Sequence, residues 1–143
     1  MKKRIFFSLL PLIGGIIVSL IISSSINYSE LIKPPLAPPK IIFPIVWSVL
    51  YILLGISYFI VNDKKVDETY LKGLLVNLLW PIIFFVFKLY FVSFLWLLLL
   101  LLFVITLYKE FYKINKIGAL LQWPYIIWVI FALYLNFGIF ILN

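Results

Sequence analysis

Two stretches decide the fold: KPPLAPPKIIFPIVWSVLY, from Lys33 to Tyr51, and WPYIIWVIFALYLNFGIFILN, from Trp123 to Asn143. In each, prolines precede or open an uncharged, aromatic-rich run. Such a run is long enough to cross the hydrocarbon core of a bilayer as a helix, which takes about 20 apolar residues. Because both runs begin at prolines and carry aromatic side chains, we interpret them as two walls of one pocket inside a membrane.

The composition places the whole chain in a membrane. Hydrophobic residues make up 66% of it and charged residues 12%, and the mean hydropathy is +1.21, which is far from the balance of a soluble domain. Charges divide the sequence into five uncharged runs, and the fourth, which contains LWLLLLLLFVITL, is apolar on every face, unlike a β-barrel strand. We therefore predict an all-α membrane protein, a bundle of five transmembrane helices forming a single domain over 1–143. The helices are expected at roughly 5–26, 42–61, 70–90, 92–111 and 118–142.

The basic residues predict the orientation. In a five-helix topology, three of them fall on one side of the membrane: Lys33, Lys40 and Lys88. The other nine fall on the opposite side: Lys2, Lys3, Arg4, Lys64, Lys65, Lys72, Lys109, Lys113 and Lys116. The excess of basic residues marks the cytoplasmic side, so we expect a cytoplasmic N-terminus and an external C-terminus. The net charge of +7 thus reflects topology and attraction to anionic lipid, and we expect no nucleic-acid partner.

The missing residue types narrow the chemistry. The chain has no His and no Cys, and its only Met is residue 1. The usual axial ligands of haem iron and the usual ligands of zinc are therefore absent. Catalytic triads of the Ser-His or Cys-His type are excluded for the same reason. We expect no metal site and no resident cofactor.

Three of the predicted helices carry a stripe of aromatic and polar side chains at helical spacing. The stripes are Phe43, Trp47 and Tyr51 on the second helix; Asn77, Trp80, Phe84 and Lys88 on the third; and Tyr125, Trp128, Ala132 and Asn136 on the fifth. Trp47 and Trp128 lie several residues inside their helices, where an interfacial aromatic belt explains them less well. Asn77 and Asn136 need hydrogen-bond partners in hydrocarbon, and these are either a ligand or neighbouring helices. The loop from Asn27 to Lys40 is positioned to form a lid.

With these motifs the chain resembles the TspO/MBR family, the translocator protein also called the peripheral benzodiazepine receptor, in its bacterial form. The resemblance rests on LIKP followed by Pro38 and Pro39, FPIVWSVLY from Phe43, NLLWPIIFF from Asn77, PYIIW from Pro124, and Leu135 with Asn136, all in the family's order and spacing. The first loop departs from the pattern, because the positions where the family has tryptophans read Asn27, Tyr28, Pro35, Leu36 and Ile41.

The resemblance implies a homodimer with a pocket for porphyrins and similar planar apolar ligands. The implied pocket residues are Trp47, Tyr51, Asn77, Trp80, Phe84, Trp128, Ala132 and Leu135, to which the stripes add Phe43, Tyr125 and Asn136. We expect a sensor, carrier or scavenger of tetrapyrroles, with lysines such as Lys33 and Lys40 near the mouth to meet carboxylates. Two alternatives stay open: an enzyme that degrades porphyrin in light and oxygen, with Trp47 and Trp128 as its redox-active residues, and a structural or stress-response partner without a small ligand.

Overall fold

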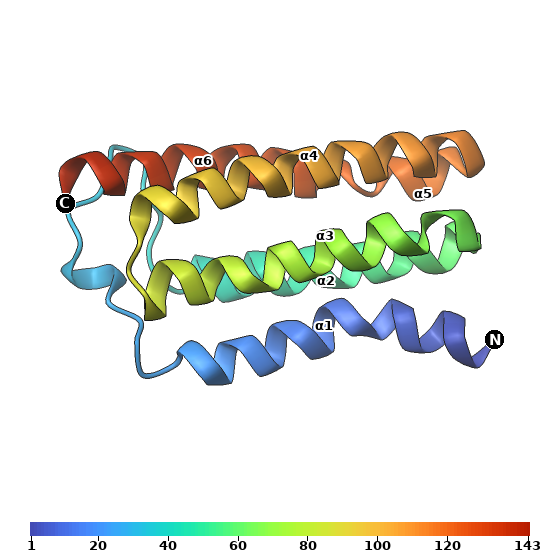
Figure 1. The fold of residues 1–143 in the computed structure, drawn as a ribbon, viewed down its shortest axis with the longest axis horizontal. Helices are drawn as coiled ribbons and strands as arrows, with labels where there is room; N and C mark the ends of the chain where they lie inside the picture. The colour runs from blue at the N-terminus through green and yellow to red at the C-terminus, as the bar shows by residue number, and fades with distance from the viewer.

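Six α-helices form an elongated bundle in the computed structural model, which describes residues 1–143 (Figure 1). Five segments are long and apolar enough to cross a membrane, which confirms the predicted class: Lys2–Ile22, Ile42–Val61, Lys64–Val86, Tyr90–Ile114 and Lys116–Leu142. The helices are α1 (Lys2–Ile22), α2 (Ile42–Val61), α3 (Asp67–Pro81), α4 (Tyr90–Ile114), α5 (Lys116–Leu120) and α6 (Trp123–Leu142). Short 3₁₀ turns occur at η1 (Tyr28–Glu30) and η2 (Lys64–Val66), and a π-helical turn, η3 (Ile82–Val86), extends α3.

The predicted boundaries hold for some helices and shift for others. The second helix has the expected limits, 42 and 61, and it ends where Asn62 takes a left-handed conformation with φ 48°. The first helix ends at Ile22 rather than at 26, and the third spans 67–86 rather than 70–90. Lys88 stops the third span, because its φ of 55° cannot continue a right-handed helix. The fifth span is divided into α5 and α6 by the turn at Leu121 and Gln122.

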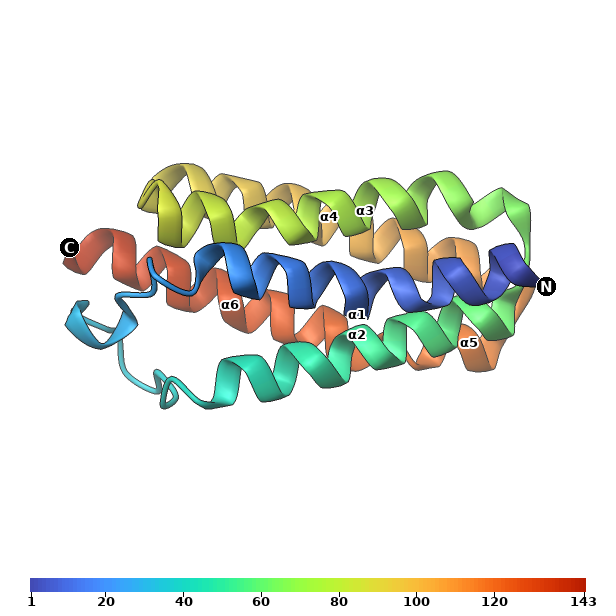
Figure 2. The ribbon, with the colours of Figure 1, turned by 90° about the horizontal axis from the view of Figure 1, so that it is seen from below.

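The helices pack side by side with the two chain ends at opposite ends of the bundle (Figure 1). Helix α1 packs mainly on α2, α4 packs on both α3 and α6, and α5 packs on α4 and α2. Of the residues in the apolar window of α1, 17% are buried, against 39% for α2. Helix α1 is thus a peripheral wall: Figure 1 shows it along one edge of the bundle, with α2 and α3 between it and α6, and Figure 2 shows its outer side.

The first loop, between α1 and α2, rests on the C-terminal part of α6. A side chain at Gly138 would place its Cβ 2.5 Å from Pro34 Cγ, so only glycine allows this approach. The Tyr134 hydroxyl donates to the carbonyl of Pro35. The Asn143 amide accepts from the Ile32 N–H at 3.1 Å and donates to the Ile32 carbonyl at 2.8 Å. The non-covalent contacts described here thus hold the loop against α6.

Candidate ligand-binding site

A cavity of about 530 Å³ lies in the half of the bundle next to the first loop. Its walls come from α1, α2, α6 and the end of α3 with η3, and most of its lining residues are hydrophobic. Pro81 lies in the wall at the junction of α3 and η3, where the helix changes from α to π geometry. A proline interrupts the helical hydrogen bonds, and the wider π turn redirects the aromatic residues that follow it.

The structure brings most of the predicted site residues together around this cavity. Those that line it are Phe43, Trp47, Tyr51, Trp80, Phe84, Ala132, Leu135 and Asn136. The others, Asn77, Tyr125 and Trp128, are not in its lining. They lie behind the wall and support the residues that form it.

Trp47 is the central aromatic residue of the site. Its ring centroid is 5.7 Å from that of Tyr51 and 6.4 Å from that of Trp80, at small interplanar angles of 31° and 34°. Trp80 continues the series to Phe84 at 5.1 Å. Trp128 stands behind Trp47 at 6.4 Å with its ring nearly perpendicular, at 88°. Aromatic surface thus covers two sides of the cavity, and Trp128 packs edge-on against Trp47.

Asn77 connects three helices beneath the cavity. The Tyr51 hydroxyl of α2 donates to Asn77 Oδ1 at 2.7 Å, and Asn77 Nδ2 donates to the Tyr125 hydroxyl of α6. All three side chains are buried. Of the two roles considered for this amide, its hydrogen bonds match the structural one, because they hold Tyr51 in the wall.

Asn136 combines both roles, since it lines the cavity and also makes three hydrogen bonds within the protein. Its Oδ1 accepts from Trp80 Nε1 and from Ser93 Oγ, each at 3.0 Å, and its Nδ2 donates to the Tyr90 carbonyl at 2.8 Å. These bonds join α3, α4 and α6. They also set the plane of the Trp80 indole that faces the cavity.

The first loop supplies the edge of the cavity through Tyr28 and Lys40. The buried Tyr28 hydroxyl donates to the Pro38 carbonyl at 2.7 Å, and burial raises the pKa of this phenol, so it stays a donor. The Lys33 ammonium donates to the carbonyls of Tyr28 and Leu31, both at 3.0 Å, and is therefore used within the loop. Lys40 lines the cavity and is exposed. Of the two lysines expected at the mouth, Lys40 is the one in position to meet a carboxylate.

Sequence reasoning missed the α1 wall. Leu12, Gly15, Ile16, Val18, Ser19 and Ile22 all line the cavity, yet α1 has no aromatic stripe and reads as a helix that faces lipid only. The one available signal was the pair Gly14 and Gly15, because adjacent glycines in an otherwise bulky membrane helix mark a close approach by a neighbouring element.

Several known proteins resemble this chain in sequence. The sequence model of the TspO/MBR family matches residues 7–142. The Tryptophan-rich protein TspO of Archaeoglobus fulgidus is 34% identical over 122 residues, which cover 81% of this chain and 79% of the relative. Protein CrtK of Rhodobacter capsulatus is 37% identical over 124 residues, with coverages of 81% and 78%. The Tryptophan-rich sensory protein of Cereibacter sphaeroides is 30% identical over 120 residues, with coverages of 81% and 76%.

Proposed function

The chain belongs to the TspO/MBR family, and from that premise we propose that its cavity binds a tetrapyrrole or a similar planar apolar molecule, with the protein acting as a membrane sensor, carrier or scavenger. The observation that carries this proposal is the aromatic wall of Trp47, Tyr51, Trp80 and Phe84 along one cavity. Each aromatic face that stacks on a flat ring contributes about 0.5–1.5 kcal/mol beyond the burial of its area.

The size and polarity of the cavity support the same class of ligand. Pockets for drug-sized molecules measure about 300–1,000 Å³ and combine apolar walls with a few polar groups, and this one is about 530 Å³. Its polar groups are few: Asn136 deep in the wall and Lys40 at the edge. A flat ring with a carboxylate at one end matches that arrangement. The name "Tryptophan-rich sensory protein" of one relative favours a sensing role.

The test is a titration of the purified protein with protoporphyrin in the dark, in which the quenching of tryptophan fluorescence reports binding. Ala132 lies in the α6 wall and is 5% exposed, so Ala132→Leu adds volume into the cavity and is expected to weaken binding by about tenfold or more. Ala132→Ser, which has nearly the original volume, is the matched control and is expected to bind normally. Equal affinity of the two variants would place the ligand outside this cavity.

A second candidate is porphyrin degradation in light and oxygen. What favours it is that Trp47 lines the cavity with a second indole, Trp128, 6.4 Å behind it. If Trp47 loses an electron, the neighbouring Trp128 can replace it. Illumination of the porphyrin complex in air is then expected to bleach the porphyrin bands, and Trp128→Phe is expected to slow bleaching while binding in the dark persists. Bleaching at the rate of free porphyrin would exclude this activity.

We also propose that the protein is a homodimer, on the strength of the family alone. Its subunit mass of 16.8 kDa makes monomer and dimer easy to distinguish by sedimentation in density-matched detergent. A single monomeric species at high protein concentration would overturn the dimer.

A further inference from the structure

The cavity reaches the outer surface of the bundle between α1 and α2. Several residues both line the cavity and are exposed on the outside of the protein: Ile16 and Ser19 of α1, and Ile41, Pro44 and Ser48 at the start of α2. The lining residues of α6 are instead all buried, namely Ala132, Leu135, Asn136 and Ile139. The opening therefore faces sideways between two membrane-spanning helices, at the level of their ends next to the first loop.

Helix α1 contains a built-in point of bending. Pro11 has no N–H to donate to the carbonyl of Phe7, four residues earlier. The Tyr70 hydroxyl of α3 donates to that same carbonyl at 2.6 Å. A neighbouring helix thus supplies the bond that the proline removes, and α1 is free to change its angle here without exposing a bare carbonyl to lipid.

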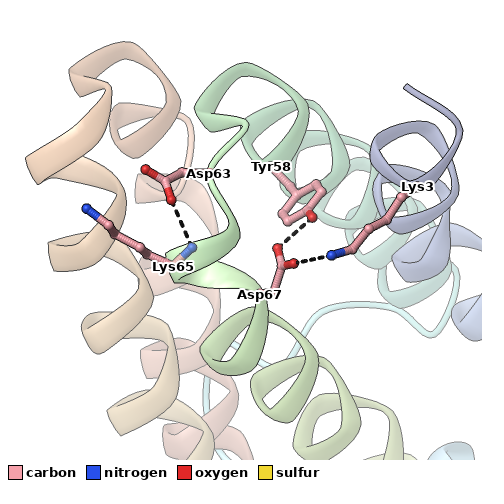
Figure 3. Close-up of polar contacts among 5 residues, drawn as sticks. All are labelled: Lys3, Tyr58, Asp63, Lys65 and Asp67. Carbon is pink, nitrogen blue, oxygen red and sulfur yellow. Dashed lines mark hydrogen bonds and ion pairs between the residues drawn. The ribbon is translucent and has the colours of Figure 1, made fainter.

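The residues before Pro11, which we call the anchored half (Lys3–Leu10), are fixed to the bundle by several bonds. The Lys3 ammonium pairs with the Asp67 carboxylate at 2.9 Å, and the same carboxylate accepts from the Tyr58 hydroxyl at 2.7 Å (Figure 3). Arg4 Nε donates to the Phe59 carbonyl at 2.8 Å.

The backbones of α1 and α2 also touch in the anchored half. At Gly55 an added Cβ would collide with the Ser8 carbonyl oxygen. Any shift of this half would therefore separate a close backbone contact as well as break the polar bonds.

The residues after Pro11, which we call the cavity half (Gly14–Ile22), make no hydrogen bond to another helix, and the close contacts of Gly14 with Leu78 and of Gly15 with the Tyr51 ring are with side chains. The one side-chain hydrogen bond within the cavity half is local, from Ser19 Oγ to the Ile16 carbonyl of the same helix at 2.7 Å. Most side chains here face outward, including Ile16, Ile17 and Leu20, which are more than half exposed. This half is held by apolar contacts alone, so moving it breaks no polar bond.

We propose that the gap between α1 and α2 is a lateral portal through which the ligand enters from the bilayer, opened by bending of the cavity half about Pro11. This inference rests on the proposed function, and it assigns the ligand's class as a planar amphiphile dissolved in the membrane. Its ring slides between Ile16 and Ser48 while its carboxylates stay at the headgroup level, near Lys40. A charge carried through the hydrocarbon instead would cost several kcal/mol.

A cross-link across the portal tests the route. The chain has no cysteine, so Ile17→Cys and Ile45→Cys, at exposed positions outside the cavity lining, can be joined by a flexible bis-maleimide in vesicles. Protein-free vesicles preloaded with protoporphyrin are then mixed with the vesicles that hold the protein. The quenching of tryptophan fluorescence is followed over time. The bridge is expected to slow both binding and release by about tenfold or more, with little change in Kd, because it hinders passage and leaves the site intact.

The matched control joins Arg4→Cys to Phe59→Cys, at a contact that already exists in the anchored half, and is expected to leave the rates unchanged. Unchanged rates with the portal bridge would overturn the proposal. Absence of saturable quenching in the unbridged protein would instead reject the proposed function, and the portal would then be judged by the next measurement alone.

A measurement without ligand tests the bending itself. Spin labels on Ile17→Cys and Ile45→Cys report on the portal end, and labels on Ile5→Cys and Ile56→Cys report on the anchored end of the same two helices; all four positions are exposed. Pulsed electron–electron distance measurements in vesicles are expected to give a broader distribution at the portal end. Equal widths for the two pairs would overturn the hinge.

Discussion

The replacement of a helical hydrogen bond by the Tyr70 hydroxyl predicts a measurable coupling between Tyr70 and Pro11. In the natural sequence Tyr70→Phe removes the donor to the Phe7 carbonyl, and Pro11 has no N–H to take its place. An unpaired buried group costs about 1–3 kcal/mol. The Phe ring keeps the stacking on Tyr58, at 4.3 Å between centroids, so the loss is confined to the hydroxyl.

In a Pro11→Ala background the same substitution is expected to cost less. The alanine restores the N–H that bonds the Phe7 carbonyl, and the hydroxyl then adds only an ordinary interhelical hydrogen bond, worth on average about 0.6 kcal/mol in a membrane protein. The difference is a coupling of about 0.4–2.4 kcal/mol, obtained from the free energies of unfolding of the four proteins during reversible denaturation in mixed detergent micelles. Distant or independent residues are additive within about 0.3–0.5 kcal/mol. A coupling below about 0.4 kcal/mol, and thus no larger than this scatter, would refute the account of the hinge.

Other parts of the structure give three more predictions. Asn136→Leu leaves the Trp80 N–H without its acceptor and is expected to lower the free energy of unfolding by about 1–3 kcal/mol; a loss below about 0.6 kcal/mol would mean that the indole finds another partner. Asp67→Asn removes the ion pair with the half-exposed Lys3 and is expected to cost less than about 1 kcal/mol, and less again in high salt; a loss that does not respond to salt would contradict this. A reporter fused after Asn143 is expected to be active only outside the cytoplasm, and activity inside would reverse the orientation.

Much of the fold was predictable because charge and hydropathy specify membrane helices directly. The second helix matched at both ends, since the prolines before it and Asn62 after it are strong boundary signals. The third did not, because whether Pro81 kinks, breaks or widens a helix depends on its neighbours rather than on its own sequence. The left-handed Lys88 is equally invisible in a sequence, as lysine has no preference for that conformation.

The candidate site was predictable where aromatic periodicity marks a face and not elsewhere. The stripe on α2 identified Phe43, Trp47 and Tyr51, all of which line the cavity. The stripe on α6 includes Ala132 and Asn136, which line the cavity, and Tyr125 and Trp128, which lie behind the wall. Helical spacing gives the face of a residue and not its depth, so residues a turn or two apart on one stripe can belong to a pocket and to the packing beneath it. The α1 wall has no aromatic residue, and Ser19 is its only polar side chain, so no stripe marks this face in the sequence.

The attachment of the first loop to α6 limits how far α1 can move at its portal end. With Pro34, Pro35 and Ile32 held against α6, the segment between Ile22 and Tyr28 is the only slack on that side. The five residues 23–27 reach roughly 17 Å when fully extended. In the proposed bending this segment acts as a tether of fixed length, so the largest opening is set by the length of residues 23–27 rather than by a contact within the bundle. Deleting two of the serines at 23–25 would shorten the tether by roughly 7 Å. A narrower opening would then exclude wide ligands at the portal, before they reach the aromatic wall.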